Sequence, residues 1–301
     1  MLGDFGTRKR RPWVAVVISL FQPFLGMLFL NRGRWALVYL AVQIALIVFF
    51  FIALPTFPSP EKVAPSFQTA IGLITLVGAC HCFFIARKWD NHQALHRYAR
   101  RWYMAAIAYY GLFGILLAVR TYLYQPFNVP SAAMIPTVNV GDFFLAEKSA
   151  YNSAGPERGD IIVFHTPMFG NTTFFKRVVG LPGDHIQMKN SLLNINGSII
   201  PRTRLADISV VCGKGHCAAQ QYRETLPSER SYLVIQLDPT GPGNNTDVVT
   251  VPAFTYFVLG DNRDNSADSR TSLGYVRRDR ILGRVAFKYI TDRHWTWQAI
   301  N

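Results

Sequence analysis

The sequence predicts a helical membrane region followed by a mainly antiparallel all-β domain outside the cytoplasm, with a β lobe inserted into that domain. Long apolar runs fill the first part of the chain, and basic residues cluster beside them. The later part has short β-rich runs divided by Gly, Pro, Asn and Asp. A chain of 301 residues has room for two such units. We place the membrane region at 1–121, the β domain at 122–301 and the inserted lobe at about 185–256.

Three apolar runs suit helices that cross a bilayer, which requires about 20 residues. They cover residues 35–54, 67–86 and 103–119. The last run is shorter than the other two, but the flanking Trp102 and Arg120 can anchor its ends at the membrane surface. We therefore predict three transmembrane helices.

The apolar run at residues 13–30 contains Pro23 near its middle, so we expect a re-entrant or interfacial hairpin. Basic residues flank it on both sides, in RKRR at 8–11 and NRGR at 31–34. Because cytoplasmic loops carry an excess of Lys and Arg, both flanks belong in the cytoplasm. The segment 87–101, with five Lys or Arg and one acidic residue, belongs there too. Three spans then place the β domain on the outer side.

The net charge of +13 does not indicate a nucleic-acid partner, because the charge is unevenly distributed. Residues 1–121 hold 13 Lys or Arg against 3 acidic residues, whereas residues 122–301 hold 18 against 15. The basic surplus thus lies beside the apolar runs, as membrane topology requires, and not on a soluble surface that could follow phosphates. The expected partner of this charge is the lipid bilayer.

The cysteines divide into two pairs. Cys212 and Cys217 bracket the short loop CGKGHC in the part predicted to lie outside, where an oxidising environment allows a disulfide. A metal site at this loop is the weaker alternative, because no fourth ligand is apparent. Cys80, His81 and Cys82 are consecutive in a predicted helix and point in different directions, so we expect them to pack. We predict no metal and no cofactor.

Three dense motifs stand out in the β domain. They are FNVPSAAMIPTVNVGD at 127–142, FFKRVVGLPGD at 174–184 and GDNRDNSADSR at 260–270. Other catalytic patterns are missing from the sequence, namely HExxH, a glycine-rich phosphate loop and GxSxG. The histidines of the domain are scattered, so a Ser-His-Asp triad has no obvious place.

Lys176 stands in a strand-like run, where alternation puts it on the face opposite Phe175 and Arg177. Burial against apolar side chains lowers the pKa of a lysine, and a neutral lysine can take a proton from a serine hydroxyl. The alternative is a surface lysine on an edge strand, which the isolated stretch favours.

The motif at 260–270 carries acidic and basic residues that we expect to neutralise one another within the loop. Such a loop is most often structural, and it can also support a site. Ser266 is then a candidate for orienting a lysine by a hydrogen bond.

In this order and after a membrane anchor, the three motifs closely resemble those of bacterial type I signal peptidases. RGDIIVFHTP at 158–167 matches a fourth segment of that family. The resemblance covers most of 122–184 and 257–290. It implies a multi-pass Ser–Lys endopeptidase of the bacterial cytoplasmic membrane, whose catalytic domain removes signal peptides from exported preproteins at the outer, or periplasmic, face. It also implies the secretion machinery as a partner, and no cofactor.

The resemblance assigns roles by position. Lys176 resembles the general base, and Ser266 the residue that orients its amine. Ser131 resembles the residue whose hydroxyl helps the N–H of residue 133 form the oxyanion hole. Asp268 and Arg270 resemble a supporting ion pair. Five apolar residues resemble those that shape shallow pockets for small substrate side chains, with core packing as the alternative for each: Phe127, Val129, Met134, Val138 and Phe175.

In this family the residue directly before M-x-P-T is the nucleophilic serine, and here it is Ala133. A methyl group cannot attack a carbonyl, so we expect an inactive form that still binds substrate. Ser131 is no substitute, because moving the point of attack would ruin its alignment. A deliberate Ser-to-Ala replacement is favoured, because Lys176, Ser131 and Ser266 are all present.

Two alternatives to a deliberate replacement stay open. The first is a naturally non-catalytic membrane factor that binds signal peptides. The second is a slip of one residue in the alignment, which is disfavoured because PS and M-x-P-T fix both sides of Ala133.

Overall fold

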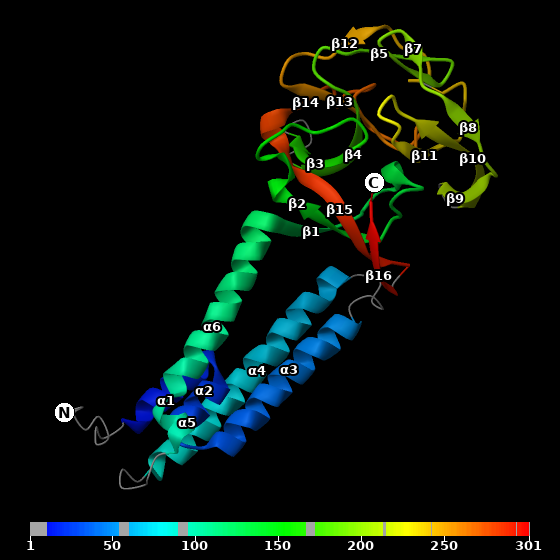
Figure 1. Cartoon of the computed structure of the whole chain (residues 1–301). Helices are drawn as coiled ribbons and strands as arrows, with labels where there is room; N and C mark the ends of the chain where they lie inside the picture. The colour runs from blue at the N-terminus through cyan, green and yellow to red at the C-terminus, as the bar shows by residue number, and fades with distance from the viewer. Residues whose placement is uncertain are drawn as a thin grey trace. The chain divides into compact units, whose positions relative to one another are not determined.

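The computed structural model describes residues 11–53, 60–89, 96–166, 172–212, 215–241, 243–292 and 294–300. The chain divides into two compact units, Met1–Leu117 and Ala118–Asn301. The first consists of helices and the second mainly of antiparallel strands (Figure 1). The predicted change from apolar helices to a β domain is therefore present, and the division lies four residues before the predicted one.

The first unit contains long apolar helices that lack charged residues over most of their length. Three stretches have the length and composition to cross a membrane, and they overlap the three predicted spans: Gly33–Phe50, Pro65–Arg87 and Trp102–Leu123. The orientation of these helices across a bilayer stays a prediction. The helices are α1 (Pro12–Phe21), α2 (Pro23–Phe29), α3 (Gly33–Ala53), α4 (Pro60–Arg87), α5 (Arg97–Arg100) and α6 (Trp102–Ala118), followed by a π-helical turn (Val119–Leu123).

The helical hairpin α1–α2 breaks at Gln22, directly before Pro23. Proline suits the first position of a helix because its missing N–H has no partner there. The two helices pack so closely that a β-carbon at Gly26 would lie 1.8 Å from Ser19 Oγ. The Gln22 side chain also donates to the Tyr109 hydroxyl at 2.8 Å. A hairpin was predicted at this position, and its placement in a membrane stays a prediction.

The main sheet of the second unit has the strand order β1-β2-β15-β3-β4-β13-β14, and β16 pairs with β15. All of these neighbours are antiparallel. The strands are β1 (Tyr124–Asn128), β2 (Phe143–Glu147), β3 (Ile161–Thr166), β4 (Thr172–Gly180), β13 (Thr255–Leu259), β14 (Val276–Arg277), β15 (Ile281–Thr291) and β16 (His294–Ala299).

The segment between β4 and β13 forms two smaller antiparallel sheets. One has the order β12-β5-β6-β7, and the other has β11-β10-β8 with β9 paired to β10. Asn196 and Gly197 form the hairpin turn between β6 and β7, and both residues have positive φ. The strands are β5 (His185–Lys189), β6 (Leu192–Ile195), β7 (Ser198–Ile199), β8 (Arg202–Arg204), β9 (Ile208–Cys212), β10 (Gly215–Thr225), β11 (Ser231–Gln236) and β12 (Val249–Thr250).

Of the two cysteines expected to pack within a helix, Cys82 is buried and Cys80 is exposed. Cys80 and Cys82 are free thiols on α4. Cys212 ends β9 and Cys217 lies on β10, two strands that pair as a hairpin with Cys217 opposite Val210. A disulfide between Cys212 and Cys217 stays a prediction.

Candidate active site

Ala133 lies in a short 3-10 turn, Ala132–Met134, that follows β1. Two backbone hydrogen bonds hold the loop that contains this turn: Val129 N–H donates to Asp142 O, and Gly141 N–H donates to Val129 O, both at 2.9 Å. A third, from Ile135 N–H to Ala132 O at 3.2 Å, closes the turn itself. Ala133 is buried and its neighbour Ser131 is exposed. The turn therefore has one face on the core and one face open.

The apolar residues predicted to shape substrate pockets are brought together beneath this turn. Val129, Met134, Val138 and Phe175 are buried in one cluster, and Phe127 packs against it while partly exposed. The four buried side chains therefore pack in the core, which was the alternative to a substrate pocket. The partly exposed Phe127 is the one of the five with surface left for a ligand.

The loop at 260–270 contacts the turn from the other side. The Asn262 N–H donates to Ala133 O at 3.1 Å, and Asn262 Nδ2 donates to Ala132 O at 3.1 Å. A β-carbon at Gly260 would lie 2.6 Å from Ala133 O and 2.2 Å from Ser266 Oγ. Only glycine fits at this approach, and it brings Ser266 close to the turn.

Lys176 lies on β4 between β3 and β13 and has 3% of its surface exposed. Its amine is 5.9 Å from the centre of the Phe174 ring, two residues away on the same strand face. Burial lowers the pKa of the amine to about 8, although the carboxylates of Asp268 and Asp261 oppose this shift; Arg270 supports it. Lys176 is therefore a buried lysine on an interior strand, and the alternative of a surface lysine on an edge strand is wrong.

Two ion pairs fix the loop beside Lys176. Arg177 holds Asp261 through two hydrogen bonds of 2.9 and 2.8 Å, both groups being fully buried. Arg270 holds Asp268 in the same bidentate way, with both bonds at 2.9 Å. The N–H of Gly260 donates to Asp268 at 3.1 Å. Asp268 therefore links the surroundings of Lys176 to the glycine that contacts Ala133.

The expected neutralisation within the 260–270 loop is wrong for three of its charges, one of which is Asp264, whose carboxylate accepts hydrogen bonds from the N–H groups of Leu237 and Asp238. Asp261 pairs with Arg177 of β4, and Arg263 pairs with Glu224 of β10. Only Asp268 and Arg270 pair inside the loop. The reason is burial, because carboxylates and guanidinium groups that leave water need the best-placed partner, which here comes from neighbouring strands.

Glu224 also accepts a hydrogen bond from the Tyr232 hydroxyl at 2.9 Å, and burial raises the pKa of that tyrosine. Arg177 stacks over the Tyr232 ring at 4.3 Å. Strands β10 and β11 thus supply the side chains that contact Arg263 of the 260–270 loop and Arg177 of β4. Sequence reasoning missed Glu224, Tyr232 and Asn262, and only Asn262 carried a signal, since it lies within a motif.

Ser266 is partly buried, and its hydroxyl has no hydrogen-bond partner among the residues that the structure describes. The predicted hydrogen bond to Lys176 is therefore not formed here, although Ser266 lies in the same neighbourhood. Within the described ranges, no three His, Cys, Asp or Glu side chains come together in a way that could hold a metal ion.

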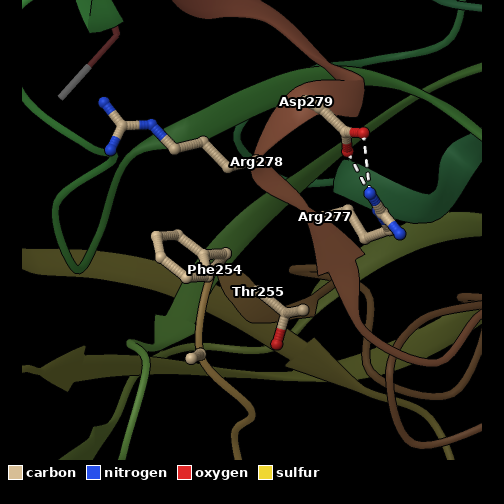
Figure 2. Close-up of a pocket in the computed structure, with 6 residues that line it drawn as sticks. Phe254, Thr255, Arg277, Arg278 and Asp279 are labelled. Carbon is tan, nitrogen blue, oxygen red and sulfur yellow. Dashed lines mark hydrogen bonds and ion pairs between the residues drawn. The ribbon is translucent and has the colours of Figure 1, made fainter.

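A separate pocket of about 700 Å³ lies at the start of β13 and the end of β14, and it shares no residue with the site around Lys176 and Ala133. Figure 2 shows its lining, with Arg277 bound to Asp279 by two contacts and the Phe254 ring on the side of Arg278. Asp279 neutralises Arg277, whereas Arg278, which also lines the pocket, donates to the backbone oxygen of Ala154 at 3.3 Å.

The cluster around Lys176 can perform one part of a hydrolytic reaction. An amine with a pKa of about 8 is partly neutral near neutral pH and can accept a proton. The methyl group of Ala133, however, supplies neither a proton nor a nucleophile. The arrangement can therefore accept a proton, and it lacks the hydroxyl that would attack a carbonyl.

Comparison with known proteins gives consistent matches. Residues 99–290 match the family described as "Signal peptidase, peptidase S26". Proteins named Signal peptidase I from Rickettsia prowazekii (strain Madrid E) and Rickettsia typhi (strain ATCC VR-144 / Wilmington) are 32% identical over 209 residues, covering 61% of this chain and 78% of each relative. A solved signal peptidase I from Enterococcus faecalis V583 is 27% identical, with a TM-score of 0.26, and the match covers 44% of this chain and 97% of that one.

Proposed function

Because this chain belongs to the signal peptidase family, peptidase S26, we propose that its β domain binds the signal peptides of exported preproteins at the site around Ala133 and Lys176. The observation that carries this proposal is the buried Lys176 amine, whose pKa is lowered to about 8 beside the loop that contacts Ala133. A neutral lysine in such a place is the general base that Ser–Lys hydrolysis requires.

The remaining roles follow the motif positions. Lys176 is the base, and Ser266 orients its amine once a hydroxyl or a bound peptide reorganises the site. Ser131, on the open face of the turn, assists the N–H of Ala133 in binding the substrate carbonyl. Asp268 and Arg270 hold Gly260 against the turn. Phe127, backed by Val129, Met134, Val138 and Phe175, limits the size of the substrate side chains that can enter.

Ala133 makes this chain a form that binds without cutting. Substrate recognition by strand addition and shallow pockets does not need the hydroxyl, whereas acyl transfer does. A second candidate function follows from the same residue, namely a non-catalytic membrane factor that binds signal peptides. Replacement of Ala133 by serine separates the two, because only the first candidate regains cleavage.

The membrane arrangement is part of the proposal. Three spans with their basic flanks in the cytoplasm put the β domain on the outer face of the bacterial cytoplasmic membrane, where exported preproteins emerge. A shared membrane raises the effective concentration of substrate near the site. In that oxidising space Cys212 and Cys217 form a disulfide, and the strands between 185 and 256 act as a separate lobe. The bilayer and the secretion machinery are the expected partners.

Binding without cutting is tested with the chain as it stands, purified in detergent. We expect a fluorescent preprotein peptide with alanine directly before the cleavage position to bind at least about tenfold more tightly than the same peptide with phenylalanine there, because the shallow pocket rejects the ring. Fluorescence anisotropy measures both affinities, and gel analysis of the same samples should show no cleavage. Equal affinities for the two peptides would refute the proposed recognition.

A further inference from the structure

The Ala132–Ala133 peptide unit is held on one side by the side chain of Asn262. Asn262 Nδ2 donates to Ala132 O at 3.1 Å, and the backbone N–H of Asn262 donates to Ala133 O at 3.1 Å. One residue thus binds the carbonyls on both sides of the α-carbon of Ala133. No other residue in the described part of the chain does this.

Because the Ala132–Ala133 peptide unit is planar, the hydrogen bond from Asn262 to its oxygen also fixes the direction of its N–H. The peptide bond between Ala132 and Ala133 is trans, so its N–H points opposite to its C=O. Because Asn262 fixes the oxygen of Ala132, it also fixes the N–H of Ala133, which points away from the Asn262 amide. The exposed Ser131 precedes Ala133 by two residues in the chain.

We propose that Asn262 is a positioning residue that aims the N–H of residue 133 at the carbonyl oxygen of the bound substrate. The inference rests on the proposed function, because it assigns the substrate carbonyl as the acceptor. It adds a residue to which sequence reasoning gave no role.

Asn262 is itself held firmly. It has 2% of its surface exposed and forms a parallel bridge with Ile235 of β11. The N–H of Ile235 donates to Asp261 O at 2.9 Å, and the N–H of Arg263 donates to Ile235 O at 3.0 Å. Strand β11 thus fixes the backbone on both sides of Asn262.

The side chain of Asn262 does not have the contacts expected of a purely structural amide. Its Oδ1 is buried and has no hydrogen-bond partner in the described chain. A buried amide that leaves its oxygen unpaired is not optimised for stability. The orientation is instead the one that aims Nδ2 at Ala132 O, since only the amide nitrogen can donate.

Removing this side chain should leave the turn folded. The N–H of Ile135 also donates to Ala132 O, at 3.2 Å, so the 3-10 turn keeps its own closing bond. What Asn262→Ala removes is the second restraint on the plane of the Ala132–Ala133 peptide. The expected defect is therefore in the aim of the N–H of Ala133, and not in folding.

The test compares two peptides on the chain as it stands. One is a preprotein peptide with its normal scissile amide, and the other carries a trans-alkene in place of that amide, so it lacks the carbonyl oxygen. We expect the parent chain to prefer the amide peptide by about tenfold, the effect of one hydrogen bond. In Asn262→Ala this ratio should fall to about one. Asn265→Ala, an exposed asparagine in the same loop, is the matched control and should keep the parent ratio.

Each other outcome has a defined meaning. If Asn262→Ala weakens both peptides equally and keeps their ratio, Asn262 is only structural and the inference is wrong. If the parent chain binds both peptides equally well, the N–H of Ala133 does not contact the substrate carbonyl, and again the inference is wrong. If the parent chain binds neither peptide, the proposed function itself fails, and the inference fails with it.

A second readout uses the chain in which Ala133 is replaced by serine. There Asn262→Ala should lower kcat about 100-fold and leave KM within about threefold, because the oxyanion forms only in the transition state. An equal change in kcat and KM for Asn262→Ala and Asn265→Ala would contradict this role.

Discussion

Ala133→Ser is expected to convert the chain from a binding form into an active signal peptidase, with cleavage of a preprotein faster by about 10⁴-fold or more. The reason is that the rest of the site is in place: Lys176 is buried with a pKa of about 8, and Gly260 and Asn262 hold the turn. The added hydroxyl supplies the nucleophile that the methyl group cannot. Single-turnover cleavage of a preprotein in detergent, followed on gels, measures the effect.

The control for this replacement is Ala132→Ser, which puts the same hydroxyl one residue away. Because attack requires the oxygen and the substrate carbonyl to be aligned within a few tenths of an ångström, Ala132→Ser should stay inactive. Activity from Ala132→Ser instead would mean that the motif alignment slips by one residue. No activity from either variant would favour the non-catalytic binding factor.

In the chain restored with serine at position 133, Lys176→Met should lower kcat by about 10⁴-fold or more and leave KM nearly unchanged. Methionine fills a similar volume in the buried position without an amine, so we expect the protein to stay folded. Lys189→Met, which removes an exposed lysine from β5, is the matched control and should keep full activity. Steady-state kinetics with circular dichroism as the folding check separates the two variants.

The restored chain should also show a defined pH dependence. The base acts only when it is neutral, so its protonated fraction lowers the rate below its pKa of about 8. The value of kcat/KM should therefore fall about tenfold per pH unit well below 8 and level off above it. Turnover that survives Lys176→Met, or a profile without this acidic limb, would exclude Lys176 as the base.

Local features of the chain were predictable from sequence. The apolar runs at 35–54, 67–86 and 103–119 are helices because a run of that length and hydropathy has few other stable forms. The Asn196–Gly197 pair is a typical hairpin-turn sequence, because these two residues accept positive φ readily, and it forms such a turn here. Burial of Lys176 followed from its place in an apolar strand, once the resemblance to a family favoured it over a surface position.

The partners of the buried charges were not predictable in this way. Arg177 meets Asp261 across 84 residues of sequence, and Arg263 meets Glu224 across 39. Such pairs depend on which strands become neighbours, and local patterns do not contain that information. The role of Asn262 also depends on a contact made 130 residues away, at Ala132. The motif at 260–270 therefore predicted where the loop lies in the sequence, but not which residues its side chains contact.

Lys176 is expected to hold a buried amine whose pKa is lowered to about 8, so that part of the population is uncharged near neutral pH. The most direct measurement is an NMR titration of the lysine side chains, with ¹³C at Cε, in the chain as it stands; Lys176→Arg identifies the signal. We predict a midpoint of about 8 for Lys176, well below the ordinary value of 10.5. A midpoint near 10.5 would mean a solvated, charged amine and would contradict the account.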